Sequence, residues 1–195
     1  MSDSNTPWFQ RIANLADSGW WKSNDLGFEA INVRGRGTRY KLTDEAVTTQ
    51  MMIAPLATDI ADTGILASVM VLKAFDAATS CCLLRMIVKT PASADQFYDL
   101  TMNPFTGEFS APSSAEYKHG SVVDAIDAWR VSLICTVPAG AKSNVQVSIA
   151  PACGAKPGKY EPGAHGGVTV RDLTFRYMNP AAYVKQARDW AVAGK

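Results

Sequence analysis

The sequence predicts an all-β fold, an antiparallel jelly-roll β-sandwich with short helical segments at both termini. Residues 129–137 alternate strictly, with Trp129 beginning an apolar face and Arg130 beginning a more polar one. A period of two is typical of an antiparallel strand with one buried face, which needs a second sheet to cover it. Residues 97–109 read as a hairpin around turn-forming residues at 103–107. About ten such short segments separated by turns favour a sandwich.

Composition allows one large domain. Of the 195 residues, 47% are hydrophobic, which is enough for a sizeable core. The sequence contains no internal repeat and no linker long enough to divide that core. We therefore expect an N-terminal arm with a short helix (1–17), the sandwich (18–178), and a C-terminal short helix and tail (179–195).

The net charge of +1 argues against a nucleic-acid partner, because such proteins neutralise phosphates with excess Lys and Arg. Arg34, Arg36, Arg39 and Lys41 form a local exception. Sheet edges often have positive charge, which favours a solvated strand edge here over a phosphate site.

The N-terminal helix is expected to begin at Thr6-Pro7, a capping hydroxyl followed by proline at the first helical position. Trp8, Ile12 and Leu15 follow at helical spacing. A segment this short is not stable alone, so it must dock on its own domain or on a partner chain.

The expected strands follow in order. Ile65 begins a segment that is apolar on both faces, as in a central strand. In the last strand the apolar face switches between Val170 and Leu173, which predicts a β-bulge near Arg171 and Asp172. Polar or glycine-rich loops are expected at 111–120 and 151–167. The strand-like segments are 20–22, 28–33, 38–42, 48–56, 65–75, 82–89, 97–102, 108–109, 129–137, 145–149 and 168–177.

The C-terminal helix is expected to begin at Asn179-Pro180, by the same capping logic as at Thr6-Pro7. Tyr183, Ala187 and Trp190 would share one side of it.

Residues for chemistry are few. Four cysteines without a Cys-x-x-Cys pair and two histidines argue against a zinc site, and no cofactor motif occurs. No nucleophile–base motif is present, so we expect no enzyme. The carboxylates Asp95, Asp99 and Glu108 near one hairpin, and Asp124 and Asp127 near the next strand, are read first as solvated charges. Calcium ligands or a glycosidase pair are the alternatives.

No secretory signal or membrane span is apparent, which predicts synthesis in a reducing cytoplasm.

The order of these segments resembles the jelly-roll domain of many tailed-bacteriophage virion proteins, which is similar to family 4/9 carbohydrate-binding modules. The Pro-Ala-Gly turn after the Trp129 strand is one such feature, and the glycine-rich loop before the last strand is another. The matching segments are residues 20–21, 98–100 with Gly107, 128–132 and 138–140, then Tyr160, Gly163, Gly166, Gly167, Tyr177, Pro180 and Tyr183.

This resemblance implies a structural virion protein, either a capsid decoration (cement) protein or a short fibre, assembled in the host cytoplasm. Its partners would be the major capsid protein or another virion protein and sister subunits, with a trimer favoured. The interface candidates are the aromatic and apolar residues of the terminal helices, Trp8, Phe9, Ile12, Tyr183 and Trp190.

The alternative is a carbohydrate-binding module that recognises host surface glycans. It requires exposed aromatic side chains in a groove. The candidates are Trp21, Tyr98, Tyr117 and Tyr160.

Overall fold

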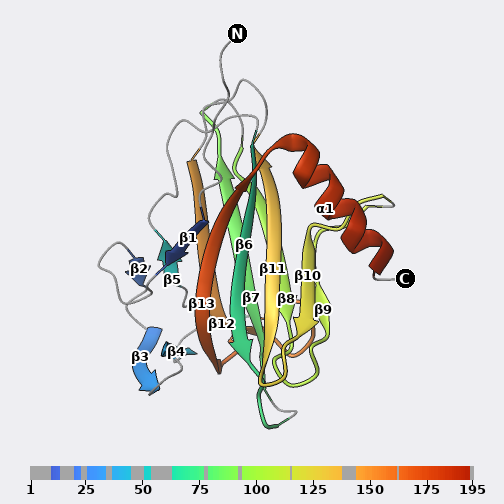
Figure 1. Ribbon diagram of the computed structural model, residues 1–195. Helices are drawn as coiled ribbons and strands as arrows, with labels where there is room; N and C mark the ends of the chain where they lie inside the picture. Colours follow the sequence, from blue (N-terminus) through green and yellow to red (C-terminus); the bar gives the residue numbers. More distant parts are fainter. Residues whose placement is uncertain are drawn as a thin grey trace.

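The computed structural model confirms the two-sheet antiparallel β-sandwich (Figure 1). It describes residues 10–13, 20–22, 26–33, 37–44, 51–53, 63–76, 79–91, 94–114, 116–137, 144–161 and 163–193. Sheet A has seven strands, in the order β10-β11-β6-β13-β4-β3 with β1 beside β13. Sheet B has six, in the order β2-β5-β12-β7-β8-β9. The inner faces of the two sheets meet in one apolar core.

Many of the strands are joined by short connections, as the turn residues predict. The element bounds are β1 Gln10–Ala13, β2 Trp20–Lys22, β3 Leu26–Val33, β4 Gly37–Asp44, β5 Met51–Ile53, β6 Thr63–Leu72, β7 Cys81–Lys89, β8 Gln96–Met102, β9 Phe109–Ser110, β10 Gly120–Asp124, β11 Ala128–Val137, β12 Asn144–Gly154, β13 Gly166–Met178 and α1 Pro180–Ala193.

Strand β11 confirms the alternation read from the sequence. Val131, Leu133 and Cys135 are buried in the central core, and Trp129 packs against it while half-buried. On the opposite face, Ile134 is also buried, because α1 lies across the outside of sheet A (Figure 1).

The β-bulge predicted in the last strand is present. The register of β13 against β6 shifts between Arg171 and Thr174. Asp172 has φ +52°, a left-handed conformation that aspartate tolerates better than most residues. The bulge moves Leu173 onto the core face, so the apolar residues on both sides of it stay buried.

The N-terminal helix prediction is wrong where the structure describes that segment. Gln10–Ala13 is strand β1, antiparallel to β13 with Gln10 opposite Arg176. Hydrogen bonds to β13 give this short segment stable partners, whereas a helix of its length has none. Trp8 and Phe9, with the Thr6-Pro7 cap, lie outside the described residues.

One strand was missing from the prediction, and one predicted loop is shorter than expected. Strand β10 begins at Gly120, where its residues Gly120–Asp124 pair with β11. This edge strand does not alternate between apolar and polar residues, because its burial falls from Gly120 to Asp124 instead of alternating between two faces. Strand β12 extends to Gly154, past the predicted loop start at residue 151.

The C-terminal helix prediction is confirmed. Asn179 accepts a hydrogen bond at Oδ1 from the Ala182 backbone N–H at 2.8 Å, the expected N-cap. Tyr183 and Ala187 are buried against Ile134 and Met178, with Trp190 partly buried beside them. Within the described part of the chain, no helix is both long and apolar enough to span a bilayer.

Candidate functional site

A continuous row of residues crosses sheet B. Trp21 on β2 lies opposite Met52 on β5, which lies opposite Ser148 on β12. Ser148 lies opposite Arg85 on β7, and Arg85 opposite Asp99 on β8. The core residues of β7, β8 and β12 alternate with Arg85, Asp99 and Ser148, so these three belong to the outer face of the sheet.

Arg85 and Asp99 form a bidentate ion pair at the centre of this face. Arg85 donates from Nε to Asp99 Oδ1 and from one terminal nitrogen to Oδ2, both at 2.7 Å. The Tyr160 hydroxyl donates to the same Oδ2. Bidentate, charge-assisted pairs hold both groups in fixed orientations. Two of the five guanidinium N–H groups of Arg85 make these hydrogen bonds to Asp99.

Two aromatic side chains flank the ion pair. Phe97, two residues before Asp99 on the same strand face, is 54% exposed, and Tyr160 is 52% exposed. The Arg85 guanidinium lies 5.3 Å from the centre of the Phe97 ring. Exposed aromatic faces beside oriented polar groups are the arrangement that binds amphipathic ligands such as sugar rings.

The loop after β12 positions Tyr160. Gly158 donates its backbone N–H to Thr101 Oγ1 at 2.6 Å, and Glu161 donates its own to the Cys153 carbonyl at 2.9 Å. Beneath this loop, Cys81, Leu83, Ala150 and Cys153 form a small apolar cluster. The loop is therefore packed onto sheet B on both sides of Tyr160.

The pKa values of Arg85 and Tyr160 are both shifted upward by their surroundings. Hydrogen bonding to Asp99 raises the pKa of Arg85 above its ordinary value. Burial, followed by the Asp99 carboxylate, raises the pKa of the Tyr160 phenol. Tyr160 therefore stays a neutral hydrogen-bond donor and Arg85 a cation at neutral pH.

Two polar atoms on this face are buried without a hydrogen-bond partner among the described residues. They are Ser148 Oγ, in a residue only 1% exposed, and Gln146 Oε1, two residues earlier on β12. Buried polar groups in folded proteins are nearly always paired, with protein, water or a ligand. Ser148 lies opposite Arg85, whereas Gln146 is separated from Phe97 by Ile87 on β7.

The structure separates the four glycan-binding candidates. Trp21 and Tyr160 belong to sheet B and its covering loop, in the region just described. Tyr98 packs against the central core with its ring 5.8 Å from His119. Tyr117 lies below α1, where the Arg188 guanidinium is 5.6 Å from its ring centre. Phe97 and Arg85 were not among the sequence candidates, although their alternation with core residues was visible.

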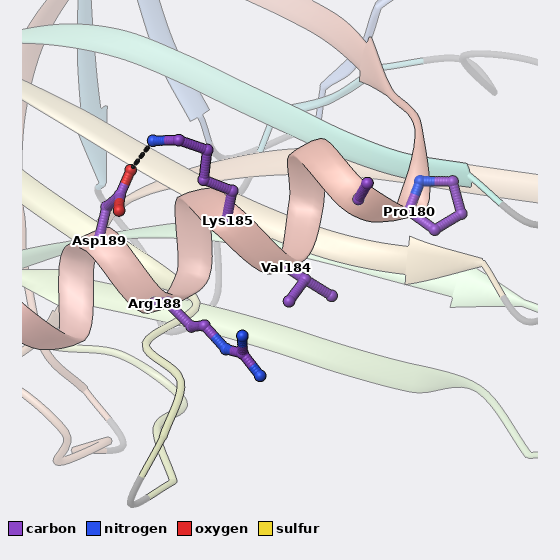
Figure 2. A pocket seen from close by; sticks show the side chains of 6 residues that line it. Pro180, Val184, Lys185, Arg188 and Asp189 are labelled. Carbon is purple, nitrogen blue, oxygen red and sulfur yellow. Dashed lines mark hydrogen bonds and ion pairs between the residues drawn. The ribbon is translucent and has the colours of Figure 1, made fainter.

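The terminal candidates for an interface are also separated. Tyr183 is 8% exposed and packs on its own domain, as Trp190 does in part. Ile12 lies on β1, while Trp8 and Phe9 lie outside the described residues. A hollow of about 480 Å³ follows the outer side of α1, where Lys185 and Asp189 pair at 2.6 Å (Figure 2).

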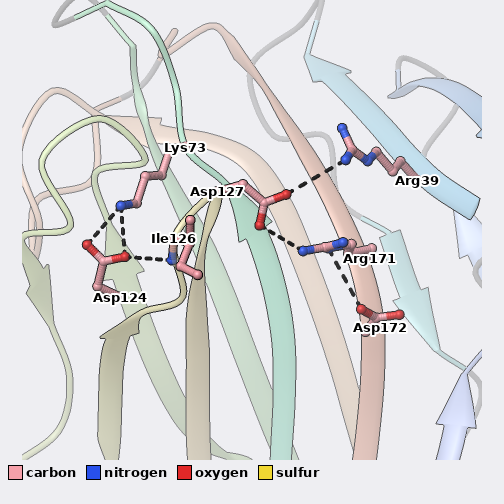
Figure 3. A network of polar contacts seen from close by, with 7 residues as sticks. All are labelled: Arg39, Lys73, Asp124, Ile126, Asp127, Arg171 and Asp172. Atoms are coloured by element: carbon pink, nitrogen blue, oxygen red, sulfur yellow. Dashed lines mark hydrogen bonds and ion pairs between the residues drawn. The ribbon is translucent and has the colours of Figure 1, made fainter. Parts of the chain in front are cut away.

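Of the remaining carboxylate candidates, Asp95 and Glu108 are exposed, and Asp124 and Asp127 form ion pairs. Asp124 binds Lys73 at 2.8 Å, and Asp127 binds Arg171 at 2.9 Å and Arg39 at 3.8 Å (Figure 3). These contacts assign the two carboxylates to ion pairs on the surface. Within the described residues, no group of three His, Cys, Asp or Glu side chains could hold a metal ion. Of the basic cluster, Arg34 and Arg36 lie outside the described residues.

No family model matches the chain, and no curated protein matches it. Solved structures are similar at low identity. The CBM22-1 xylan-binding domain of Paenibacillus barcinonensis Xyn10C is 8% identical over 88% of this chain and 94% of that chain, with a TM-score of 0.48. The CBM22-1–GH10 modules of Clostridium thermocellum xylanase 10B are 13% identical over 80% of this chain, with a TM-score of 0.43. This chain spans 26% of that structure.

The enzymatically active domain of bacteriophage CBA120 tailspike protein 4 is also similar. It is 12% identical over 85% of this chain and 20% of that chain, with a TM-score of 0.44.

Proposed function

We propose that this protein binds a glycan, without cleaving it, on the outer face of sheet B. The observation that supports this most is the grouping of Phe97 and Tyr160, both half-exposed, around the Arg85–Asp99 pair. The aromatic rings would contact the apolar face of a sugar, and the Arg85 guanidinium group would donate to its oxygen atoms.

Binding without hydrolysis follows from the state of Asp99. Its two oxygen atoms accept three hydrogen bonds, from Arg85 and Tyr160, so it is poorly placed to act as an acid or a nucleophile. No second carboxylate joins it in a described contact on this face. A reducing-end assay on any bound polysaccharide should show no products, and cleavage that Asp99→Asn abolishes would contradict this.

Titration calorimetry against xylan, mixed-linkage β-glucan, galactomannan and bacterial surface polysaccharide tests the proposal. For the polysaccharide that binds, Phe97→Ala should weaken binding roughly three- to ten-fold. Phe75→Ala is the matched control, because Phe75 is 100% exposed on a different loop. Equal losses for both variants, or no binding by any polysaccharide in the panel, would refute the proposed site.

Trp21 gives a second test. Its backbone continues the row of Ser148, Arg85 and Asp99. If the ligand extends along that row, Trp21→Ala should weaken binding of long oligosaccharides more than binding of short ones.

We therefore favour glycan binding over attachment to a capsid, whereas the sequence alone favoured attachment. Attachment was inferred from the terminal aromatic residues, and Tyr183 is buried in its own domain. A role in a virion, with a capsid or other virion partner and a trimeric state, stays a hypothesis. Sedimentation of the purified protein, alone and with capsids, would test it. A monomer that leaves capsids unbound would contradict it.

A further inference from the structure

Three rows of residues cross the outer face of sheet A, on β11, β6 and β13. The middle row has hydroxyl side chains, Ser132 opposite Ser68 and Ser68 opposite Thr174. The row on one side consists of Arg130, Met70 and Arg171, and the row on the other of Ile134, Leu66 and Arg176. Short side chains between longer ones leave a hollow across the strands.

That hollow is a groove of about 350 Å³, here named the sheet A groove. Its floor includes Ser68, and its lining includes Arg130, Thr174 and Arg176. The Ser68 and Ser132 hydroxyls are 2.8 Å apart, and Thr174 Oγ1 donates to the Ser68 carbonyl at 3.4 Å. Hydrogen bonds within the row fix the hydroxyl groups in place and leave acceptor and donor capacity toward the groove.

Among the described residues, the groove and its rim contain more arginine than carboxylate side chains. Arg130 and Arg176 are exposed on its walls. Arg171 and Arg39 reach the carboxylate of Asp127 from neighbouring strands, and Arg171 also lies 3.8 Å from Asp172 (Figure 3). Asp172 also lines the groove, so the described residues place four guanidinium groups near two carboxylates.

The rim arginines are also incompletely bonded. The Nε atoms of both Arg39 and Arg171 are buried without a hydrogen-bond partner among the described residues. A negatively charged ligand at this end of the groove would reduce the excess charge.

We propose that the sheet A groove binds an acidic oligosaccharide, one with carboxylate or sulfate groups. Guanidinium groups match the planar geometry of such oxyanions, and the row of hydroxyls provides partners for sugar hydroxyl groups. An extended peptide would instead pair with the free edge of a sheet. Here β6 lies between β11 and β13, so its backbone groups are already paired and only side chains can recognise a ligand.

This site is independent of the glycan site on sheet B, because the two lie on opposite outer faces. Polygalacturonate tests recognition of carboxylate groups, and its methyl-esterified form is the uncharged control. Dextran sulfate tests recognition of sulfate groups, and plain dextran is its uncharged control. Calorimetry should show binding of a charged polymer and at least ten-fold weaker binding of its uncharged counterpart. Binding should weaken as salt is raised, because screening acts on exposed charges.

The double variant Arg130→Gln/Arg176→Gln should lose at least ten-fold in affinity for the acidic polymer. Arg188→Gln, which removes a cation on α1, should bind like the wild type. Circular dichroism should be unchanged, since both substituted arginines are exposed. If the double variant binds normally, or the wild type binds neither acidic polymer, the proposal fails.

Poly-L-glutamate separates a saccharide from an acidic peptide. We expect it to bind at least ten-fold more weakly than the acidic polysaccharide. If it binds equally well and is equally sensitive to Arg130→Gln/Arg176→Gln, the groove recognises acidic peptides and the saccharide assignment is wrong.

Discussion

Trp129 donates a hydrogen bond from its indole Nε1 to the carbonyl oxygen of Pro104 at 2.9 Å, joining β11 of sheet A to the β8–β9 turn of sheet B. Lys73 lies over the indole, with its Nζ 4.5 Å from the ring centre. A Cβ atom added to Gly107, in the same turn, would lie only 2.6 Å from the Trp129 ring. The indole thus closes one end of the sandwich.

Trp129→Ala should lower the free energy of unfolding by about 3 kcal/mol, the lower end of the usual range for tryptophan because the side chain is half-buried. Trp129→Phe should lose only about 1 kcal/mol, mainly the hydrogen bond to Pro104. Urea unfolding measures both. A loss under about 1 kcal/mol for Trp129→Ala would show that the indole contributes little to the core.

Gly107→Ala tests the same contact from the other side. Its φ of +78° disfavours any side chain, and the new methyl group would meet the Trp129 ring. The substitution should therefore destabilise the protein by at least about 1 kcal/mol. In the Trp129→Ala background the loss should be smaller, because only the backbone strain remains.

Helix α1 should behave as part of the domain. Tyr183 packs on Ile134, and a Cβ atom added to Gly64 would lie 3.0 Å from the Tyr183 side chain. Tyr183→Ala should lower stability by roughly 3 kcal/mol, and a truncated chain of residues 1–178, which keeps β1, should be less stable than the full chain. Ala181→Ser, on the exposed side of α1, is the control and should change stability by less than about 0.5 kcal/mol. Unchanged stability of the truncated chain would contradict this role.

Stability should depend on His119 below neutral pH. Burial lowers the pKa of His119 below the ordinary value of 6.5, and its Nδ1 lies 2.9 Å from the Tyr183 hydroxyl. The unfolded chain therefore binds a proton at a higher pH than the folded chain. Stability should fall as the pH drops from 6.5 toward the folded pKa, and this contribution should level off below it.

Urea unfolding at several pH values, compared with His119→Gln, measures this term. In that pH window, the free energy of unfolding of His119→Gln should depend less on pH than that of the wild type. His165→Gln, which changes an exposed histidine, should keep the pH dependence of the wild type. Equal pH profiles for the wild type and His119→Gln would show that His119 does not titrate differently on folding.

Ile126→Asn should stabilise the protein. Ile126 has φ +69° in the β10–β11 turn, although it is branched at Cβ, and its side chain is 92% exposed. Asparagine adopts this backbone conformation more easily, so the gain should be about 0.5–1 kcal/mol. Thermal unfolding should show a higher Tm. Val123→Asn, an exposed β10 position outside the turn, should not raise it, and a lower Tm for Ile126→Asn would mean that Ile126 makes a stabilising contact.

The sequence alone determined the elements whose signals are local. Alternation in residues 129–137 predicted β11, because the side-chain period of a strand is independent of its partners. The switch of face between Val170 and Leu173 predicted the bulge, and Asn179-Pro180 predicted the start of α1. These depend on backbone geometry within a few residues.

Strand pairing decided the rest. The sequence did not show that Gln10–Ala13 would pair with β13, or that Arg85, Asp99 and Tyr160 would meet. Nor did it show that Ser132, Ser68 and Thr174 would form one row. The register between strands sets which residues are neighbours, and a shift of one residue turns every side chain to the other face. Register follows from how both sheets bury their apolar faces together, so only the tertiary structure brings these side chains into candidate sites.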